Sequence, residues 1–243
     1  MLVYAAVTLV VTFGGGCLPL IRNWSHRQLH AVLALATGVF LGAVFLHLLP
    51  EISALEHENA GDLDSRTLWL YTLVATLSVY LFDALLFRSH DHDEAHRHRA
   101  VGYSALLGMS LHAFTEGVAF SVITSDGRVA LPYFLSTLGH KLLDGFSLSS
   151  VLRLGDFSRV KIFAWIAAFA ALTPLGMMLG DRWVHDLSPH THAIVSALAA
   201  GTFLFVSLCE LLPEVFHHRE DSTVKVTLLL AGIGASVLLN EVH

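Results

Sequence analysis

The chain has 243 residues, of which 54% are hydrophobic and only 14% are charged. Soluble domains carry about 25% charged residues, so the composition argues against a soluble globular protein. The net charge of −6 is spread among the predicted loops, and the two cysteines lie far apart in apolar surroundings. This predicts neither a nucleic-acid partner nor a disulfide framework.

Two long stretches near the N-terminus, residues 1–21 and 28–50, contain no Asp, Glu, Lys or Arg. A helix of about 20 residues crosses the hydrocarbon core of a bilayer, which is about 30 Å thick. The first stretch lacks the basic start of a cleaved signal peptide, so we expect it to remain as a spanning helix. The whole chain, 1–243, is predicted to form one transmembrane domain of eight helices, near 2–21, 29–50, 67–87, 101–124, 131–152, 160–180, 191–214 and 223–242.

Basic residues are distributed unequally between the two ends of these helices. The loops after helices 1, 3, 5 and 7 contain Arg22, Arg27, Arg88, Arg97, Arg99, Arg153, Arg159, Lys161, Arg219 and Lys225. The other three loops contain only Arg66, Arg128 and Arg182. Loops rich in Lys and Arg remain in the cytoplasm, so we expect both termini to lie outside it. The expected location is a bacterial inner or plasma membrane.

Helices 2 and 7 share an internal repeat. Residues 38–51 read GVFLGAVFLHLLPE, and residues 201–214 read GTFLFVSLCELLPE. A weaker similarity follows in helices 3 and 8, SVYLFD from Ser78 and SVLLNE from Ser236. The two copies are five helices apart, so they cross the membrane in opposite directions. An inverted repeat of this kind is typical of transporters, and helices 4 and 5 lie between its copies.

Charged residues occur in the middle of helices 4 and 5. Helix 4 contains His112 and Glu116, helix 5 contains His140 and Asp144, and a glycine follows each acid. A charge at mid-bilayer costs roughly 2.5–3.5 kcal/mol, so these groups need partners. The spacing of four places imidazole and carboxylate on one helix face, one turn apart. Two such helices would present a donor set that suits Zn²⁺, Fe²⁺, Mn²⁺ or Co²⁺.

Two other interpretations of these four residues remain open. The side chains could form structural hydrogen bonds between the helices, or they could form a proton relay. A proton relay would explain the two carboxylates, but it explains less directly why each is paired with a histidine. We therefore favour a metal site.

Further polar residues lie near the ends of the repeated helices. His47 and Glu51 are expected at the outer end of helix 2, and Glu210 and Glu214 at the inner end of helix 7. We regard them as candidates for an ion pathway, with ordinary interfacial residues as the alternative. The loop after helix 3 contains four histidines that can bind metal weakly, namely His90, His92, His96 and His98.

The motifs HAFTEG, from His112, and HKLLDGFSL, from His140, resemble those of the ZIP family of zinc and iron transporters. The eight spans, the outside termini, the histidine-bearing loop and the related helices 2 and 7 resemble that family too. The resemblance implies an all-α 3 + 2 + 3 bundle, in which inverted units of helices 1–3 and 6–8 surround helices 4 and 5. It also implies dimerisation, and metal movement into the cytoplasm with His112, Glu116 and Asp144 as primary ligands and His140 close by.

The chain departs from the family pattern at several positions. Ala113 replaces a common Asn, and Thr115 and Leu143 replace the prolines that often precede the motif acids. Lys141 occupies a position that is often an acid of a second metal site, and Thr173 stands where some members supply a further carboxylate. We therefore expect the central site to hold one ion, because an ammonium would repel a second.

We expect a transporter and not an enzyme. Its cargo would be Zn²⁺, with Fe²⁺, Mn²⁺, Co²⁺ or Cd²⁺ as other candidates, moved toward the cytoplasm without a cofactor. The other expected partners are the lipid bilayer and a second copy of the chain in a homodimer. The alternative is an intramembrane metal-dependent hydrolase, which would need an open coordination position and a water-activating carboxylate. The sequence contains no H-E-x-x-H motif, and the inverted repeat favours transport.

Overall fold

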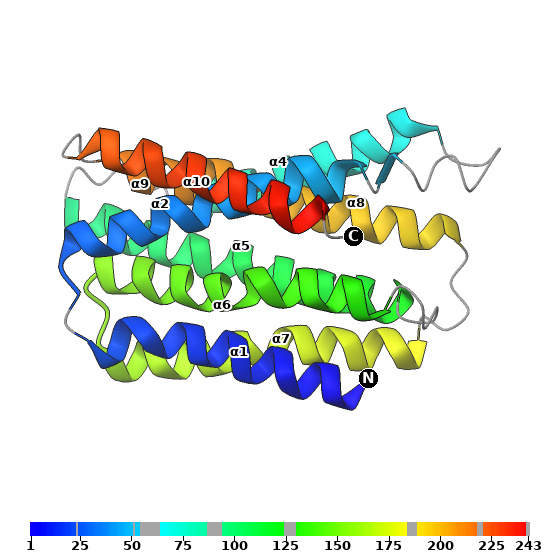
Figure 1. Ribbon diagram of the computed structural model, residues 1–243, viewed down its shortest axis with the longest axis horizontal. Coiled ribbons are helices and arrows are strands. Elements are labelled where there is room, and N and C mark those ends of the chain that lie inside the picture. The colour runs from blue at the N-terminus through cyan, green and yellow to red at the C-terminus, as the bar shows by residue number, and fades with distance from the viewer. Residues whose placement is uncertain are drawn as a thin grey trace.

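The computed structural model describes residues 1–22, 24–50, 52–53, 64–86, 94–123, 130–183, 189–217 and 221–241, and within these ranges all regular secondary structure is helical. The eight predicted helices are confirmed (Figure 1). They are α1 (Leu2–Ile21), α2 (His26–Ala43) with the π-helical η1 (Val44–Leu48), α4 (Ser65–Leu86), α5 (Glu94–Ile123), α6 (Ala130–Leu154), α7 (Arg159–Trp183), α8 (Pro189–Leu204) with the π-helical η2 (Phe205–Leu211) and α9 (Leu212–Phe216), and α10 (Ser222–Glu241).

Two helices begin three or more residues earlier than predicted. α2 starts at His26 and not at residue 29, because Ser25 and Gln28 form a capping box. The Ser25 hydroxyl accepts a hydrogen bond from the Gln28 N–H (3.3 Å), and the Gln28 side chain accepts one from the Ser25 N–H (3.1 Å). α5 starts at Glu94 and not at residue 101, so His96 and His98 belong to a helix and not to a loop. The Glu, Ala and Arg residues of this segment favour a helix despite their charge.

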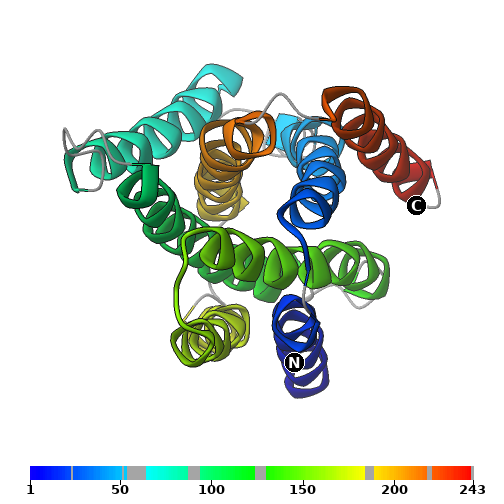
Figure 2. The same ribbon diagram turned by 90° about the vertical axis from the view of Figure 1, so that its left-hand side faces the viewer.

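Helices α5 and α6 cross the centre of the molecule, as the end-on view in Figure 2 shows. On one side, α1 packs against α6 and α7 packs against α5. On the other side, α2 pairs with α10 and α4 with α8. The repeat relates α1, α2 and α4 to α7, α8 and α10, and α5 to α6. Under this exchange the α1–α6 pair becomes the α7–α5 pair, and the α2–α10 pair becomes the α8–α4 pair. Since α2 and α8 run in opposite directions (Figure 1), the arrangement agrees with the predicted inverted repeat.

The glycines that follow the two motif acids permit close packing, but not between α5 and α6. Gly117 on α5 lies against the backbone of α7, where an added Cβ would overlap the carbonyl oxygen of Thr173. Gly145 on α6 lies in the same way against the carbonyl oxygen of Thr12 on α1. α5 is therefore in close backbone contact with α7, and α6 with α1. A larger residue at either glycine would push the two helices of that pair apart.

Both copies of the repeat contain a π-helical turn at the same place. η1 ends at Leu48 and η2 ends at Leu211, which are matching positions of the repeat. Pro50 and Pro213 each stand two residues after the end of the π turn. A proline lacks the N–H of a helical hydrogen bond and crowds the carbonyl four residues earlier, and membrane helices adapt to it through local π turns. The shared proline thus explains the shared π turn.

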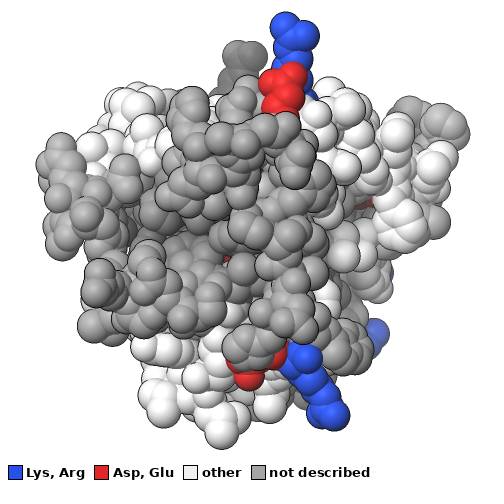
Figure 3. Space-filling view, turned by 90° about the vertical axis from the view of Figure 1, so that its right-hand side faces the viewer, with Lys and Arg blue, Asp and Glu red and all other residues white. Residues whose placement is uncertain are grey.

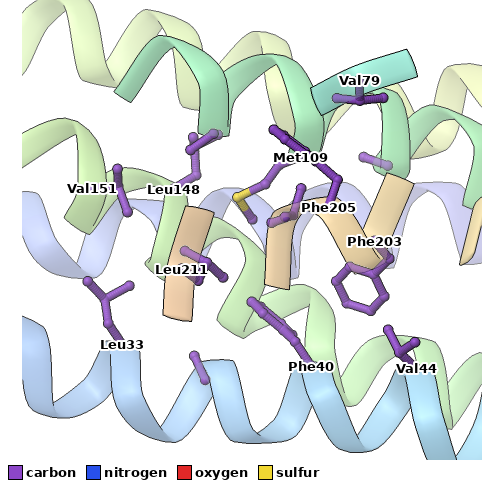
Figure 4. Close-up of a cluster of buried hydrophobic side chains, with 14 of the residues drawn as sticks. Leu33, Phe40, Val44, Val79, Met109, Leu148, Val151, Phe203, Phe205 and Leu211 are labelled. Atoms are coloured by element: carbon purple, nitrogen blue, oxygen red, sulfur yellow. The ribbon is translucent and has the colours of Figure 1, made fainter. Parts of the chain in front are cut away.

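Apolar side chains of α2, α5, α6 and η2 pack together in a buried cluster inside the bundle (Figure 4). Phe40 and Phe203 occupy matching repeat positions, are fully or almost fully buried, and have ring centroids 5.2 Å apart.

Five described helical segments are long and apolar enough to cross a membrane, namely Leu2–Ile21, His26–Leu46, Arg66–Leu85, Arg159–Arg182 and Ala193–Phe216. In the view from the right-hand end, several described Lys, Arg, Asp and Glu side chains lie at the edges of the molecule (Figure 3). The five apolar segments fit an integral membrane protein.

Candidate metal site

The crossing of α5 and α6 brings the two predicted motifs together. His112, Glu116, His140 and Asp144 each offer a nitrogen or oxygen atom, and these four atoms lie within 4.8 Å of one another. His112 and Glu116 are 3% and 6% exposed, and Asp144 is fully buried. The four-residue spacing on each helix therefore places two imidazoles and two carboxylates around one point, as the sequence predicts.

Hydrogen bonds and ion pairs connect the two motifs directly. His140 Nε2 donates a hydrogen bond of 2.6 Å to Glu116 Oε1. The fully buried ammonium of Lys141 contacts Glu116 Oε2 and donates a 2.9 Å hydrogen bond to Asp144 Oδ2. Lys141 thus lies between both acids, and its positive charge compensates part of their negative charge inside the bundle.

His112 has a different environment. Its ring stacks on Phe203 of α8, with the two centroids 3.9 Å apart and the planes inclined by 4°. Its Nε2 is 3.7 Å from Glu116 Oε2, beyond hydrogen-bond distance, and neither ring nitrogen has a hydrogen-bond partner among the described residues. The same holds for Asp144 Oδ1. Buried polar atoms normally have such partners, so these atoms are suited to bind a metal ion.

The donor set of this cluster is mixed. Imidazole nitrogen and carboxylate oxygen together suit Zn²⁺ and other first-row divalent ions, and no thiolate is present to hold a softer ion tightly. The second ring nitrogen and the second carboxylate oxygen of each residue are available to hydrogen-bond neighbours such as Lys141. The arrangement can therefore bind a divalent cation at a largely buried site.

Of the other predicted site residues, the structure describes the side chains of Glu210 and Glu214, and neither joins this cluster. Glu210 and Glu214 are buried on η2 and α9, where Glu210 accepts a 2.7 Å hydrogen bond from Ser104. Glu51, His90 and His92 lie outside the described residues, as do the side chains of His47, His96 and His98. Thr115, which precedes Glu116, donates hydrogen bonds to carbonyl groups of its own helix.

Two residues of this region were not predicted from the sequence. Phe203 was placed in a repeated helix, but its contact with His112 depends on how α8 packs against α5. His30 on α2 faces Glu214 at a distance of 3.9 Å between Nε2 and Oε1, with both side chains 4% exposed. A signal for His30 was present, because the Ser25 and Gln28 capping box starts α2 at His26 and so places His30 one full turn inside the helix.

Comparison with known proteins identifies similar sequences. A family described as ZIP Zinc transporter matches residues 87–240. The chain is 30% identical over 157 residues to the zinc transporter ZIP1 of Danio rerio, covering 62% of this chain and 51% of that protein. It is 26% identical over 287 aligned positions to ZIP9-B of Xenopus laevis, covering 97% and 95%. Mouse ZIP1 is 34% identical over 131 residues, covering 52% of this chain and 40% of the relative.

Proposed function

Since the chain belongs to the ZIP family of zinc transporters, we propose that it carries a divalent metal ion, zinc in the first place, across a membrane through the site between α5 and α6. The observation that carries this proposal is the convergence of His112, Glu116, His140 and Asp144 where α5 and α6 meet. The relatives reported above are named as zinc transporters, which favours transport over the hydrolase alternative.

Mixed ligation suits a carrier because the ion must be released after it has been bound. Imidazole and carboxylate ligands hold Zn²⁺, and also Fe²⁺, Mn²⁺, Co²⁺ or Cd²⁺, through bonds that exchange. His112 and Asp144 supply donor atoms without hydrogen-bond partners among the described residues, and Glu116 and His140 lie beside them. We assign these four residues as ligands.

Lys141 serves as an internal counterion in this proposal. Two buried carboxylates without a cation would carry a large desolvation penalty, and the ammonium contacts both of them. A divalent ion that enters between the same carboxylates displaces the ammonium from at least one of them. A second ion would meet its charge at close range, so the central site holds one ion.

The metal moves toward the end of the bundle that carries Arg22, Arg27, Arg153 and Arg159. This end is cytoplasmic by the distribution of basic residues, and both chain termini point to the opposite end (Figure 1). The Arg153 and Arg159 guanidinium groups donate hydrogen bonds to carbonyl groups at the end of α1, those of Pro19, Arg22 and Leu20. These bonds tie α6 and α7 to α1 at the cytoplasmic face.

The test is metal flux into proteoliposomes made with purified protein. Vesicles that contain the protein should accumulate Zn²⁺ above the level of protein-free vesicles, and His112→Ala should reduce the accumulation to that background. Wild-type vesicles that take up no divalent metal under any applied gradient would refute the proposed function.

A further inference from the structure

Three arginines meet at the C-terminal end of α1. Arg153, in the last turn of α6, donates hydrogen bonds through Nη1 to the carbonyl oxygens of Pro19 and Arg22. Arg159, in the first turn of α7, donates one of 3.2 Å to the carbonyl oxygen of Leu20. Arg22 itself follows α1 directly. We call this meeting point of Arg22, Arg153 and Arg159 the arginine corner.

The surroundings of the arginine corner carry an excess of positive charge. The charged side chains of residues 13–24 and 153–163 are Arg22, Arg153, Arg159, Lys161 and the single acid Asp156. Four positive charges and one negative charge give a net charge of +3. Like charges held close together repel each other, so the arginine corner favours the binding of an anion.

The chemistry of the guanidinium group indicates which anion fits. A guanidinium presents five N–H donors in a planar fork that matches the oxygens of a phosphate group. In the described part of the structure, the bonds of Arg153 to α1 use only its Nη1 group. Arg22 is exposed, and only its carbonyl group takes part in these bonds. The arginine corner therefore has donors available for a phosphate group.

A tryptophan places the arginine corner at the level of the lipid headgroups. The Trp24 indole donates a hydrogen bond of 3.1 Å to the carbonyl oxygen of Leu18, and the Arg22 guanidinium carbon lies 5.7 Å from the centre of the Trp24 ring. Tryptophan is enriched where a membrane meets water. The surface of the cytoplasmic leaflet is negative because it contains anionic lipids. An anionic headgroup is thus the phosphate group at hand at this depth.

Apolar side chains beside the arginine corner can contact the acyl chains of the same lipid. Ile21, Val160 and Phe163 are 77%, 80% and 51% exposed. Ile21 and Val160 are sequence neighbours of Arg22 and Arg159, and Phe163 lies one helical turn after Arg159. The Phe163 ring contacts Phe13 of α1, with centroids 5.3 Å apart. The seam between α1 and α7 is therefore apolar next to the basic groups.

We propose that the arginine corner binds the phosphate group of one anionic phospholipid, whose acyl chains lie along the seam between α1 and α7. The bound headgroup relieves the repulsion between the guanidinium groups, and it joins the ends of α1, α6 and α7. The proposal is independent of the transported ion, because lipid binding can be measured without metal.

Native mass spectrometry of the purified protein in detergent tests the lipid site. The probes are phosphatidylglycerol and phosphatidylcholine with identical acyl chains. One phosphatidylglycerol should bind at least about tenfold more tightly than phosphatidylcholine, and Arg22→Gln should weaken it about fivefold, the contribution of one basic residue near anionic headgroups. Arg22→Gln together with Arg159→Gln should weaken it about 25-fold. If the double variant does not fold, Arg22→Gln decides alone, because it leaves the bonds from α6 and α7 to α1 in place.

Lys161→Gln is the matched control. It removes the same charge from the same turn of α7, but Lys161 stands two residues after Arg159 and so lies about 200° further around the helix. Phosphatidylglycerol should bind this variant as tightly as the wild type. An equal loss in Lys161→Gln and Arg22→Gln would show general attraction to basic residues and would overturn the site.

Three further results would overturn the lipid site. They are equal affinities for the two lipids, unchanged phosphatidylglycerol binding in Arg22→Gln, and displacement of the lipid by millimolar inorganic phosphate. Inorganic phosphate has no acyl chain to lie against the apolar seam, so displacement by it would mean that a soluble anion is the ligand. Persistence of the lipid in phosphate buffer is the expected result.

Discussion

Helices α5 and α6 carry the same H-x-x-x-acid-Gly pattern, but the two copies lie in different surroundings. On α5, the His112 ring stacks on Phe203 and has no hydrogen-bond partner among the described residues. On α6, the His140 ring is hydrogen-bonded to Glu116, and Lys141 is placed beside Asp144. An apolar ring orients one imidazole and a carboxylate orients the other. Matching motifs in a sequence therefore do not imply matching roles in the site.

The largest expected effect is the loss of a ligand from the α5 copy. His112→Ala or Glu116→Ala should abolish flux in proteoliposomes, because each removes a donor and leaves the charges of its partners uncompensated. Thr115→Ala on the same helix is the control, since its hydroxyl bonds only to its own helix in the described structure. Normal rates and affinities in either ligand variant would show that the site is assigned wrongly.

Phe203 tests whether stacking positions His112. Phe203→Ala should weaken central metal binding by about tenfold, the lower end of the effect of losing a partner that orients a ligand. Phe40→Ala removes the other ring of the pair, and each truncation should cost about 3–5 kcal/mol of stability. Phe40 makes no ring contact with His112 in the described part of the structure, so comparing the two variants by zinc titration separates positioning from packing. Equal losses of affinity would indicate packing alone.

Lys141 is the residue of α6 that opposes the binding of a second metal ion. Lys141→Asp should raise the number of ions between α5 and α6 from one to two, because it replaces a repelling ammonium by a third carboxylate. Lys141→Met should still hold one ion. Anomalous diffraction locates and counts the ions between these helices. Two well-occupied ions between these helices in the unmodified protein would contradict the prediction.

The smallest effect is expected for the four histidines that follow α4 in the sequence. Replacing His90, His92, His96 and His98 by Ser should leave initial flux within roughly a factor of three, because such histidine-rich tracts bind metal weakly. Initial rates at low zinc concentration measure this. Complete loss of flux would mean that this segment belongs to the transport pathway.

Much of the fold could be predicted because the bilayer restricts it. α1 has the predicted bounds, Leu2–Ile21, since it lacks charge from end to end. The start of α5 was missed because the charged residues near His96 have the composition of a loop, although they also favour a helix. The capping box at Ser25 was present in the sequence and gives the start of α2.

The central site could be predicted in its residues but not in its contacts. Spacing along a helix places His112 with Glu116 and His140 with Asp144, because helical geometry is fixed. Which partner each atom meets depends on the crossing of separate helices, so neither the stacking of His112 on Phe203 nor the bond from His140 to Glu116 could be derived. The π turns before Pro50 and Pro213 were missed for a similar reason, since a proline can also be accommodated by a kink.

The position of Lys141 also has an electrical consequence. With both imidazoles neutral, one ammonium and two carboxylates give the central cluster a formal charge of −1, and a divalent ion changes it to +1. A membrane potential acts on charge with about 2.3 kcal/mol per unit charge for each 100 mV crossed. Loading therefore reverses the direction in which the field pulls on α5 and α6. A neutral residue at position 141 would leave the loaded cluster without net charge, and the field would then act only on the unloaded one.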